Sequence, residues 1–139
     1  MFNKLLAEKE MITTNFEKLS FHDASIGKVD REPGAISIEF EGAFLSKEHP
    51  YSNGEDWVIE CGVLHLLNVS SELSLFWYDD NAGKSHPTPD FPIDEVMKLD
   101  FDGKTFEFGG FLNHEPWVQW VINATEFKID IKGKHKAQI

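Results

Sequence analysis

Hydrophobic residues recur at every second position along most of this chain, and that period of two constrains the fold more than any other feature. The clearest early case is a set of four apolar residues that alternate with polar ones: Ile36, Ile38, Phe40 and Phe44. Three later stretches repeat the pattern, namely residues 73–78, 97–108 and 118–131. An antiparallel strand with one buried face needs this alternation, so the sequence predicts a mainly β protein.

Residues 57–69 predict the central strand of the sheet. One face of this segment carries seven alternating residues: Trp57, Ile59, Cys61, Val63, His65, Leu67 and Val69. Leu64 and Leu66 make the other face apolar as well, and strands that are apolar on both faces lie inside a sheet. Because His65 stands between Val63 and Leu67, we expect a core histidine with a satisfied hydrogen bond.

Turn residues separate the alternating stretches. Glu32-Pro33-Gly34 predicts a turn before the strand at residue 36, and Asp102-Gly103 predicts a hairpin. The apolar phase slips by one position near Thr125, which a β-bulge within one long last strand would explain. Residues 92–98 fit either a short helix or an early start of the next strand.

These elements predict a single-domain antiparallel β-sandwich or partly closed barrel of about seven strands, with at most one or two short helices. A chain of 139 residues and 15.9 kDa has the size of one domain. We assign residues 11–139 to this domain. Residues 1–10 are an N-terminal extension, either frayed or folded as a short helix.

The charge balance is acidic, with 24 Asp and Glu against 13 Lys and Arg and a net charge of -11. Such a chain is not held to nucleic acid or to an anionic membrane by bulk charge. No stretch reaches the roughly 18 apolar residues of a membrane span, and the N-terminus lacks the apolar region of a secretory signal. The single cysteine, Cys61, forms no internal disulfide, so we expect a cytoplasmic protein.

Most of the excess negative charge lies in the middle of the chain. Residues 55–115 carry thirteen acidic residues against three lysines. One interpretation is that acid-rich loops and solvent faces keep a small domain soluble. The other is that this region forms an acidic surface that steers a basic partner.

The segment from Asp79 to Pro92 is long for a loop in a compact domain and is therefore a candidate for function. Its acidic residues resemble a calcium loop, but Lys84 stands at the position that requires glycine. We therefore predict no metal here. The acidic residues that we expect to meet a partner are these: Asp79, Asp80 and Asp90.

Two aromatic residues are candidate anchors for the same partner. Tyr78 immediately precedes the acidic segment, and Trp117 shares a strand face with Gln119, opposite Trp120. One of the two tryptophans should therefore lie in the core and the other nearer to solvent. Partly exposed tryptophans are common anchors of protein interfaces.

His22, Asp23 and His114 are weaker candidates for base or ligand chemistry. Adjacent strand residues point to opposite faces, so we expect no pairing of His22 with Asp23, and Asp23 reads as a turn residue. Cys61 and His65 share a face, but two ligands do not complete a zinc site. The sequence lacks a phosphate-binding loop, a nucleophile elbow and a zinc-protease motif, so we expect no cofactor and favour a non-enzyme.

Two short motifs carry a family resemblance. The first is Phe21-His22-Asp23-Ala24-x-Ile26, and the second is the closing aromatic segment Trp117-x-x-Trp120-x-Ile122-x-Ala124 with Phe127-x-Ile129-x-Ile131. They resemble small uncharacterised bacterial β-rich proteins, some of which are grouped with the immunity proteins of polymorphic toxin systems. The resemblance covers residues 16–131 and implies a cytoplasmic binding protein without catalytic residues.

We therefore expect a non-catalytic acidic binding protein, monomeric or homodimeric, that engages a basic protein in the manner of an immunity-type inhibitor. An alternative is a β-barrel or sandwich that binds a small apolar ligand, since 12 Phe and four Trp supply abundant aromatic surface. A small enzyme is the third possibility. A cleft that brought His22 or His114 within hydrogen-bonding distance of a carboxylate would favour it.

Overall fold

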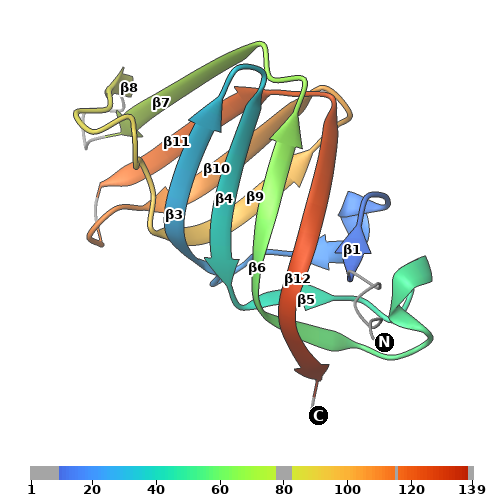
Figure 1. Cartoon of the computed structure of the whole chain (residues 1–139). Coiled ribbons are helices and arrows are strands. Elements are labelled where there is room, and N and C mark those ends of the chain that lie inside the picture. The colour runs from blue at the N-terminus through green and yellow to red at the C-terminus, as the bar shows by residue number, and fades with distance from the viewer. Residues whose placement is uncertain (1–9, 78–82, 115, 138–139) are drawn as a thin grey trace, which may run out of the picture.

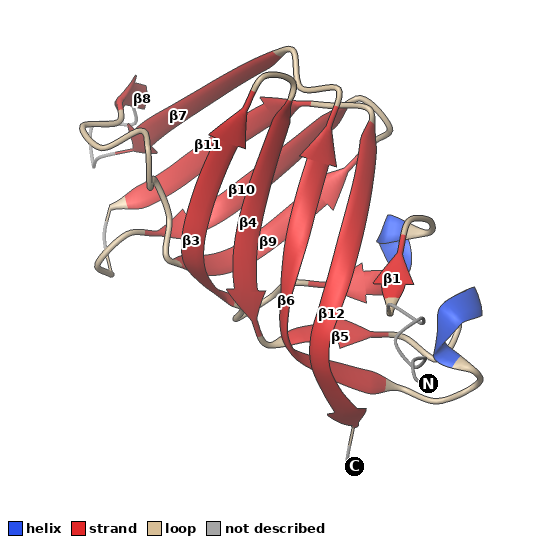
Figure 2. Cartoon of the chain, viewed as in Figure 1, coloured by secondary structure: helices blue, strands red, loops and turns tan. Residues whose placement is uncertain are grey.

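The computed structural model describes residues 10–77, 83–114 and 116–137. Strands dominate it, and the helices are two single turns, η2 (Phe16–Lys18) and η3 (Pro50–Ser52) (Figure 2). The first six strands are β1 (Met11–Ile12), β2 (Leu19–Ser20), β3 (Ser25–Glu32), β4 (Ala35–Glu41), β5 (Ala43–Leu45) and β6 (Trp57–Leu67). The other six are β7 (Ser71–Trp77), β8 (Gly83–Ser85), β9 (Glu95–Phe101), β10 (Thr105–Phe111), β11 (Trp117–Asn123) and β12 (Glu126–Lys136).

All twelve strands belong to one antiparallel sheet whose main path runs β1-β12-β6-β4-β3-β9-β10-β11-β7-β8 (Figure 1). The mainly β, antiparallel prediction is confirmed, but the predicted number of about seven strands is wrong. The sheet is not closed, since β1 and β8 are its two ends. Short strands account for much of the difference, because β1, β2, β5 and β8 have at most three residues each.

The sheet folds back on itself. We call β12, β6, β4 and β3 the front half and β9, β10, β11 and β7 the back half; the pairing of Ser25 with Glu95 joins them (Figure 1). Phe127 of β12 and Phe106 of β10 are not on neighbouring strands, yet their ring centroids are 6.4 Å apart. The inner faces of the two halves therefore pack against each other.

Aromatic side chains fill much of the space between the halves. Phe16 of η2 contacts the rings of Phe101, Phe106 and Phe127, with centroids 5.0 to 5.9 Å away. Trp120 is fully buried and packs on Phe108. Such ring pairs add stability beyond the area that they bury. Within the described part of the chain, no helix is long and apolar enough to cross a membrane.

The two predicted turns are confirmed. Glu32 pairs with Ala35 across the β3–β4 turn, where Gly34 has a φ of 75°. Asp102 caps the β9–β10 hairpin, and its Oδ1 accepts hydrogen bonds from the N–H groups of Lys104 and Thr105. These backbone hydrogen bonds lower the pKa of Asp102. The residue types at these two positions were therefore sufficient to predict both turns from the sequence.

Two predicted strand faces are wrong. Phe44 is 38% exposed and does not share the buried face of Ile36, Ile38 and Phe40. The reason is Gly42, whose φ of 93° ends the regular alternation between β4 and β5.

In β6 the buried apolar side chains are Ile59, Leu64 and Leu66. The predicted face is therefore inward at Ile59, but Val63, His65 and Leu67 point outward and are half-buried. The predicted central place of this strand is confirmed, since β4 and β12 flank it. The predicted core position of His65 is wrong. A run that is apolar on both faces does not reveal which face is turned inward.

The predicted last strand is in fact two. β11 pairs with β10 and β7 in the back half, and β12 pairs with β6 in the front half. The phase slip near Thr125 marks the connection between these halves rather than a β-bulge. Residues 92–98 contain no helix, because β9 already begins at Glu95.

Candidate functional site

The outward surface of the back half carries six hydrophobic side chains, which we call the aromatic face. They come from three neighbouring strands: Leu73, Leu75 and Trp77 of β7, Trp117 and Val121 of β11, and Phe111 of β10. The strand register places Trp117 beside both Trp77 and Phe111. Alternation explains the grouping, because Phe76, Val118 and Trp120 point the other way and are buried.

Hydrogen bonds fix one of the two outward tryptophans, and ring packing fixes the other. The Trp77 Nε1–H donates to Gln119 Oε1 at 3.0 Å, and Gln119 Nε2 donates to Glu107 Oε2 at 3.0 Å. Trp117 packs edge-on against Phe111, with ring centroids 5.4 Å apart. Its ring also covers Gly109, where an added Cβ would lie 2.5 Å from the indole. The face is therefore preorganised.

The aromatic face is partly open to solvent. Leu73 is 55% exposed, and among the described residues only Phe44 is another exposed large hydrophobic residue. The remaining members of the face are half-buried. The predicted contrast between the two tryptophans of β11 is confirmed, since Trp120 is buried and Trp117 is not. An apolar cluster on an outward sheet face is typical of an interaction surface.

The predicted partner-binding residues are only partly within the structure. Tyr78, Asp79 and Asp80 lie outside the described residues, although they directly follow Trp77 in the chain. Asp90 is exposed. On the neighbouring strands, Glu107 lies 3.9 Å from Lys98, so the charge of this lysine is partly neutralised.

One ion pair ties the segment that carries Asp90 to both halves. The guanidinium of Arg31 on β3 forms two hydrogen bonds with the carboxylate of Glu72 on β7, at 2.9 and 2.6 Å. It also donates to the backbone carbonyls of Pro89 and Asp90, at 3.0 and 2.8 Å. This clamp is not predictable from the sequence, because no local pattern links residues so far apart in the chain.

The clamp shifts the ionisation of both partners. Burial disfavours the charged form of Glu72, but the hydrogen bonds from Arg31 and from the indole of Trp120 outweigh it and lower the pKa of Glu72. The hydrogen bond to Glu72 raises the pKa of Arg31. Both groups therefore remain charged at neutral pH.

His65 joins three strands of the front half. Its Nδ1 lies 2.8 Å from Ser37 Oγ on β4, and its Nε2 lies 2.9 Å from Asp130 Oδ2 on β12. The order hydroxyl, imidazole, carboxylate is that of an activated nucleophile. The expected satisfied hydrogen bond of His65 is thus present, but at an outward position.

The surroundings of Ser37 do not suit acyl transfer. The groove beside it, of about 420 Å³, is lined by three carboxylates: Asp30, Glu32 and Glu39. An oxyanion needs hydrogen-bond donors where charge develops, and negative charge there has the opposite effect. Arg31 also lines the groove, but its guanidinium is bound to Glu72. We therefore interpret the Ser37–His65–Asp130 arrangement as a set of structural hydrogen bonds that joins β4, β6 and β12.

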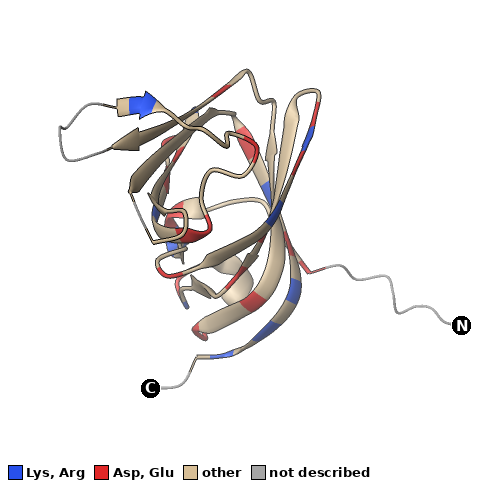
Figure 3. Cartoon of the chain, turned by 90° about the vertical axis from the view of Figure 1, so that its left-hand side faces the viewer, with Lys and Arg blue, Asp and Glu red and all other residues tan. Residues whose placement is uncertain are grey.

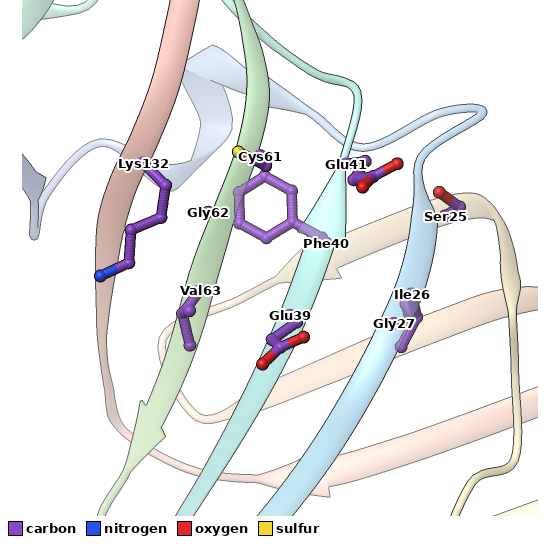
Figure 4. A pocket seen from close by; sticks show the side chains of 10 residues that line it. All are labelled: Ser25, Ile26, Gly27, Glu39, Phe40, Glu41, Cys61, Gly62, Val63 and Lys132. Carbon is purple, nitrogen blue, oxygen red and sulfur yellow. The ribbon is translucent and has the colours of Figure 1, made fainter.

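A second groove of about 450 Å³ crosses the outward surface of the front half (Figure 4). Its lining includes small residues such as Gly27 and Cys61. Glu39 and Glu41 lie on the β4 side and Lys132 on the β12 side (Figure 4). Basic residues gather along β12 towards the C-terminus (Figure 3), so this half presents opposite charges at its two sides.

A cavity of about 780 Å³ opens at one end of the molecule, between the β9–β10 hairpin and the start of β12. Phe16, Phe101 and Phe127 form its apolar part. Polar residues surround them, including Thr13 and Lys128. An apolar floor with a polar rim is common in ligand sites.

The weaker candidates lie on the surface. His22 Nε2 is 3.5 Å from Asp23 Oδ2, so the expectation that they do not pair is wrong. Neither residue is in a strand, and Asp23 has a φ of 70° that brings the side chains together; its expected turn role is confirmed. His114 is 92% exposed and its Nδ1 lies 3.9 Å from Glu95 Oε1, too far for a hydrogen bond.

Within the described residues, no group of three or more His, Cys, Asp or Glu side chains is arranged to hold a metal ion. Cys61 is a free, half-buried thiol. In the comparisons with known proteins, no family model, no curated protein and no solved structure matches this chain.

Proposed function

We propose that the chain is a non-catalytic, cytoplasmic binding protein that inhibits a basic protein by covering its working surface, as immunity-type inhibitors do. The docking surface is the aromatic face. The observation that carries the proposal is the pair of neighbouring outward tryptophans, Trp77 held by its hydrogen bond to Gln119 and Trp117 by its packing on Phe111, on the face that also exposes Leu73. Rigid aromatic side chains lose little conformational entropy on binding and are frequent interface anchors.

The charge of the chain supports a basic partner. The net charge is -11, and Asp79 and Asp80 directly follow Trp77 in the sequence. Acidic residues around an apolar anchor raise the rate of encounter with a basic protein and disfavour acidic competitors. The electrostatic part of the interaction should weaken as salt rises.

Affinity capture from a lysate of the native host, with the wild-type chain and surface variants as baits, tests the docking surface. Trp117→Ser should lose a basic partner that the wild type retains, because removal of a central anchor costs about 2 kcal/mol or more, roughly a 30-fold loss of affinity. Phe44→Ser is the matched control, since Phe44 is an exposed aromatic residue that lies on β5, away from the aromatic face. Equal capture by both variants would refute the aromatic face as the docking surface.

Charge reversal tests the partner's chemistry. Replacement of the three predicted acidic residues, Asp79, Asp80 and Asp90, by lysine should weaken capture. A control with the same change in net charge reverses three exposed carboxylates of the front half: Glu32, Glu39 and Glu41. A local acidic contact predicts a larger loss in the first variant. The same loss in both variants would mean that only total charge matters.

The cavity beside Phe101 supports a second candidate, the binding of a small apolar ligand. Its volume of about 780 Å³ exceeds the ~300 Å³ that small-molecule sites need. Titration with dodecanoate, followed by NMR, should shift the amides of Phe101 and Phe127 but not those of the aromatic face. Unchanged spectra at millimolar probe would exclude this candidate for fatty-acid-like ligands.

A further inference from the structure

Two buried histidines of this chain hold the backbone in the same way. His49 and His86 are 3% and 6% exposed, and each is followed by a proline. The Nδ1 of His86 accepts a hydrogen bond from the Thr88 N–H at 2.9 Å, and its Nε2–H donates to the Pro92 carbonyl at 2.8 Å. Because one ring nitrogen accepts and the other donates, His86 fits this place only as the neutral imidazole.

His49 repeats this arrangement at another part of the molecule. Its Nδ1 accepts from the Tyr51 N–H at 2.9 Å, and its Nε2–H donates to the Thr14 carbonyl at 2.7 Å. The intervening proline has no N–H, so the amide two residues after the histidine is the first available donor. His49 thus provides an internal control for His86, remote from β7 and β8 in the strand order.

A proton on Nδ1 of His86 is incompatible with the hydrogen bond from the Thr88 N–H. An added Nδ1–H would face that N–H, donor against donor, and would leave the N–H without its acceptor, while the Thr88 Oγ1, 3.3 Å from Nδ1, is an acceptor for the new proton. The Phe76 ring lies 4.1 Å from the imidazole, centroid to centroid. Burial lowers the pKa of His86, against the smaller opposing effect of the hydrogen bond to Pro92.

The carboxylates that line the cavity of His86 are either paired or open to solvent. Arg31 of β3 and Glu72 of β7 are paired with each other, and Asp90 lines the same cavity but is exposed. Lys84 of β8 is exposed as well. Neutral His86 is therefore the form that this environment favours at pH 7.

The segment that His86 holds borders the aromatic face. The His86 N–H donates to the Ser74 carbonyl of β7, and β8, which ends one residue earlier, pairs with Leu75–Trp77. An added Cβ on Gly83 would lie 3.1 Å from the Trp77 indole. β8 therefore covers one side of Trp77.

We propose that His86 is an acid-sensitive latch: its protonation releases residues 83–92 from β7, uncovers the Trp77 side of the aromatic face and makes docking depend on pH. The release is a property of the free protein. Only its consequence for docking rests on the proposed function.

Amide hydrogen exchange of the full chain between pH 7.5 and 5, read by NMR and corrected for intrinsic rates, tests the latch without a partner. The protection factors of Thr88 and His86 should fall by up to tenfold per pH unit once His86 titrates, since one proton is linked to opening. Those of the β7–β11 pairs should stay constant. Unchanged protection at Thr88 over this range would overturn the proposal.

Two matched variants assign the effect to one histidine. His86→Gln keeps a donor and an acceptor but does not titrate, so protection at residues 83–92 should become independent of pH. His49→Gln should leave the wild-type response of that segment intact. The same acid response in His86→Gln would overturn the proposal; if that variant does not fold, the wild-type exchange data decide. A latch that responds while Trp117→Ser captures as well as the wild type would leave the latch standing and refute the proposed function.

Discussion

Arg31 is the only arginine of the chain, and its position explains why lysine would not serve there. Its planar guanidinium reaches one carboxylate and two backbone carbonyls at once. A lysine ammonium carries three donors on a single atom and cannot reproduce the two parallel hydrogen bonds to Glu72. One side chain therefore connects β3, β7 and the segment before β9.

Arg31→Lys should lower the free energy of unfolding by about 1–3 kcal/mol, the range for lost hydrogen bonds between charged groups. Arg31 and Glu72 are 29% and 22% exposed, which keeps the expected loss below that of a fully buried pair. Urea unfolding at pH 7 measures it. The control is Lys28→Ala, which removes an exposed pair with Asp30 and should change stability by less than ~0.5 kcal/mol. Equal losses of unfolding free energy in the two variants would show that the hydrogen bonds of Arg31 add no stability.

At the scale of elements, β10 contains two adjacent glycines at the point where its register with β9 shifts. An added Cβ on Gly110 would collide with the Glu95 carbonyl oxygen and lie 2.8 Å from the Ile93 side chain. Only glycine permits this close approach of β9 to β10. β10 keeps a regular register with β11 on its other side, so the irregularity is confined to its pairing with β9.

Gly110→Ala should destabilise the fold by about 1–3 kcal/mol, because backbone atoms must move to admit the methyl group. Thermal unfolding followed by circular dichroism measures the effect. Gly27→Ala is the control, since its Cβ would meet Glu39 only at an ordinary 3.4 Å. A Gly110→Ala protein as stable as Gly27→Ala would contradict the close approach.

The comparison of sequence and structure is clearest for these elements. Alternation and turn residues were sufficient to predict β4 and the hairpin at Asp102-Gly103, because both signals are local. They did not predict that β11 and β12 belong to different halves of the sheet, since the phase slip near Thr125 has the same local form as a bulge. Pairing between distant strands leaves no local pattern.

In the candidate site, too, the features with a local sequence signal were predicted and those that depend on distant residues were not. The outward position of Trp117 follows from alternation alone, and the sequence predicted it. The Arg31–Glu72 clamp depends on the folded sheet and was missed. The two buried histidines had a visible signal, because His49-Pro50 and His86-Pro87 repeat one dipeptide. Only the structure shows that both rings bind the amide two residues further on.

At the scale of the whole molecule, acid should destabilise the fold in two separate pH ranges. The pKa of His86 is lowered in the folded state, so the unfolded chain binds more protons below about pH 6.5 and stability falls from there. The pKa of Glu72 is also lowered, so a further loss begins below about pH 4.3.

Urea unfolding at intervals from pH 8 to about pH 3 measures both losses. His86→Gln should remove the part of the upper loss that belongs to His86. Glu72→Gln should remove the part of the lower loss that belongs to Glu72, at the expense of stability at neutral pH, whereas the part that belongs to Asp102 should remain. A free energy of unfolding that is constant between pH 7 and 5 in the wild type would contradict the requirement for a neutral His86.

The place of β12 in the sheet also governs the order in which the fold can assemble. β12 follows every other described strand in the chain, yet it lies between β1 and β6. During synthesis on the ribosome, β6 has one unpaired edge and β1 has no neighbour until residues 126–136 emerge. Such pairings between distant segments form slowly and leave apolar strand edges exposed meanwhile. The front half of the sheet is therefore complete only after β12, the last of the described strands, has been synthesised.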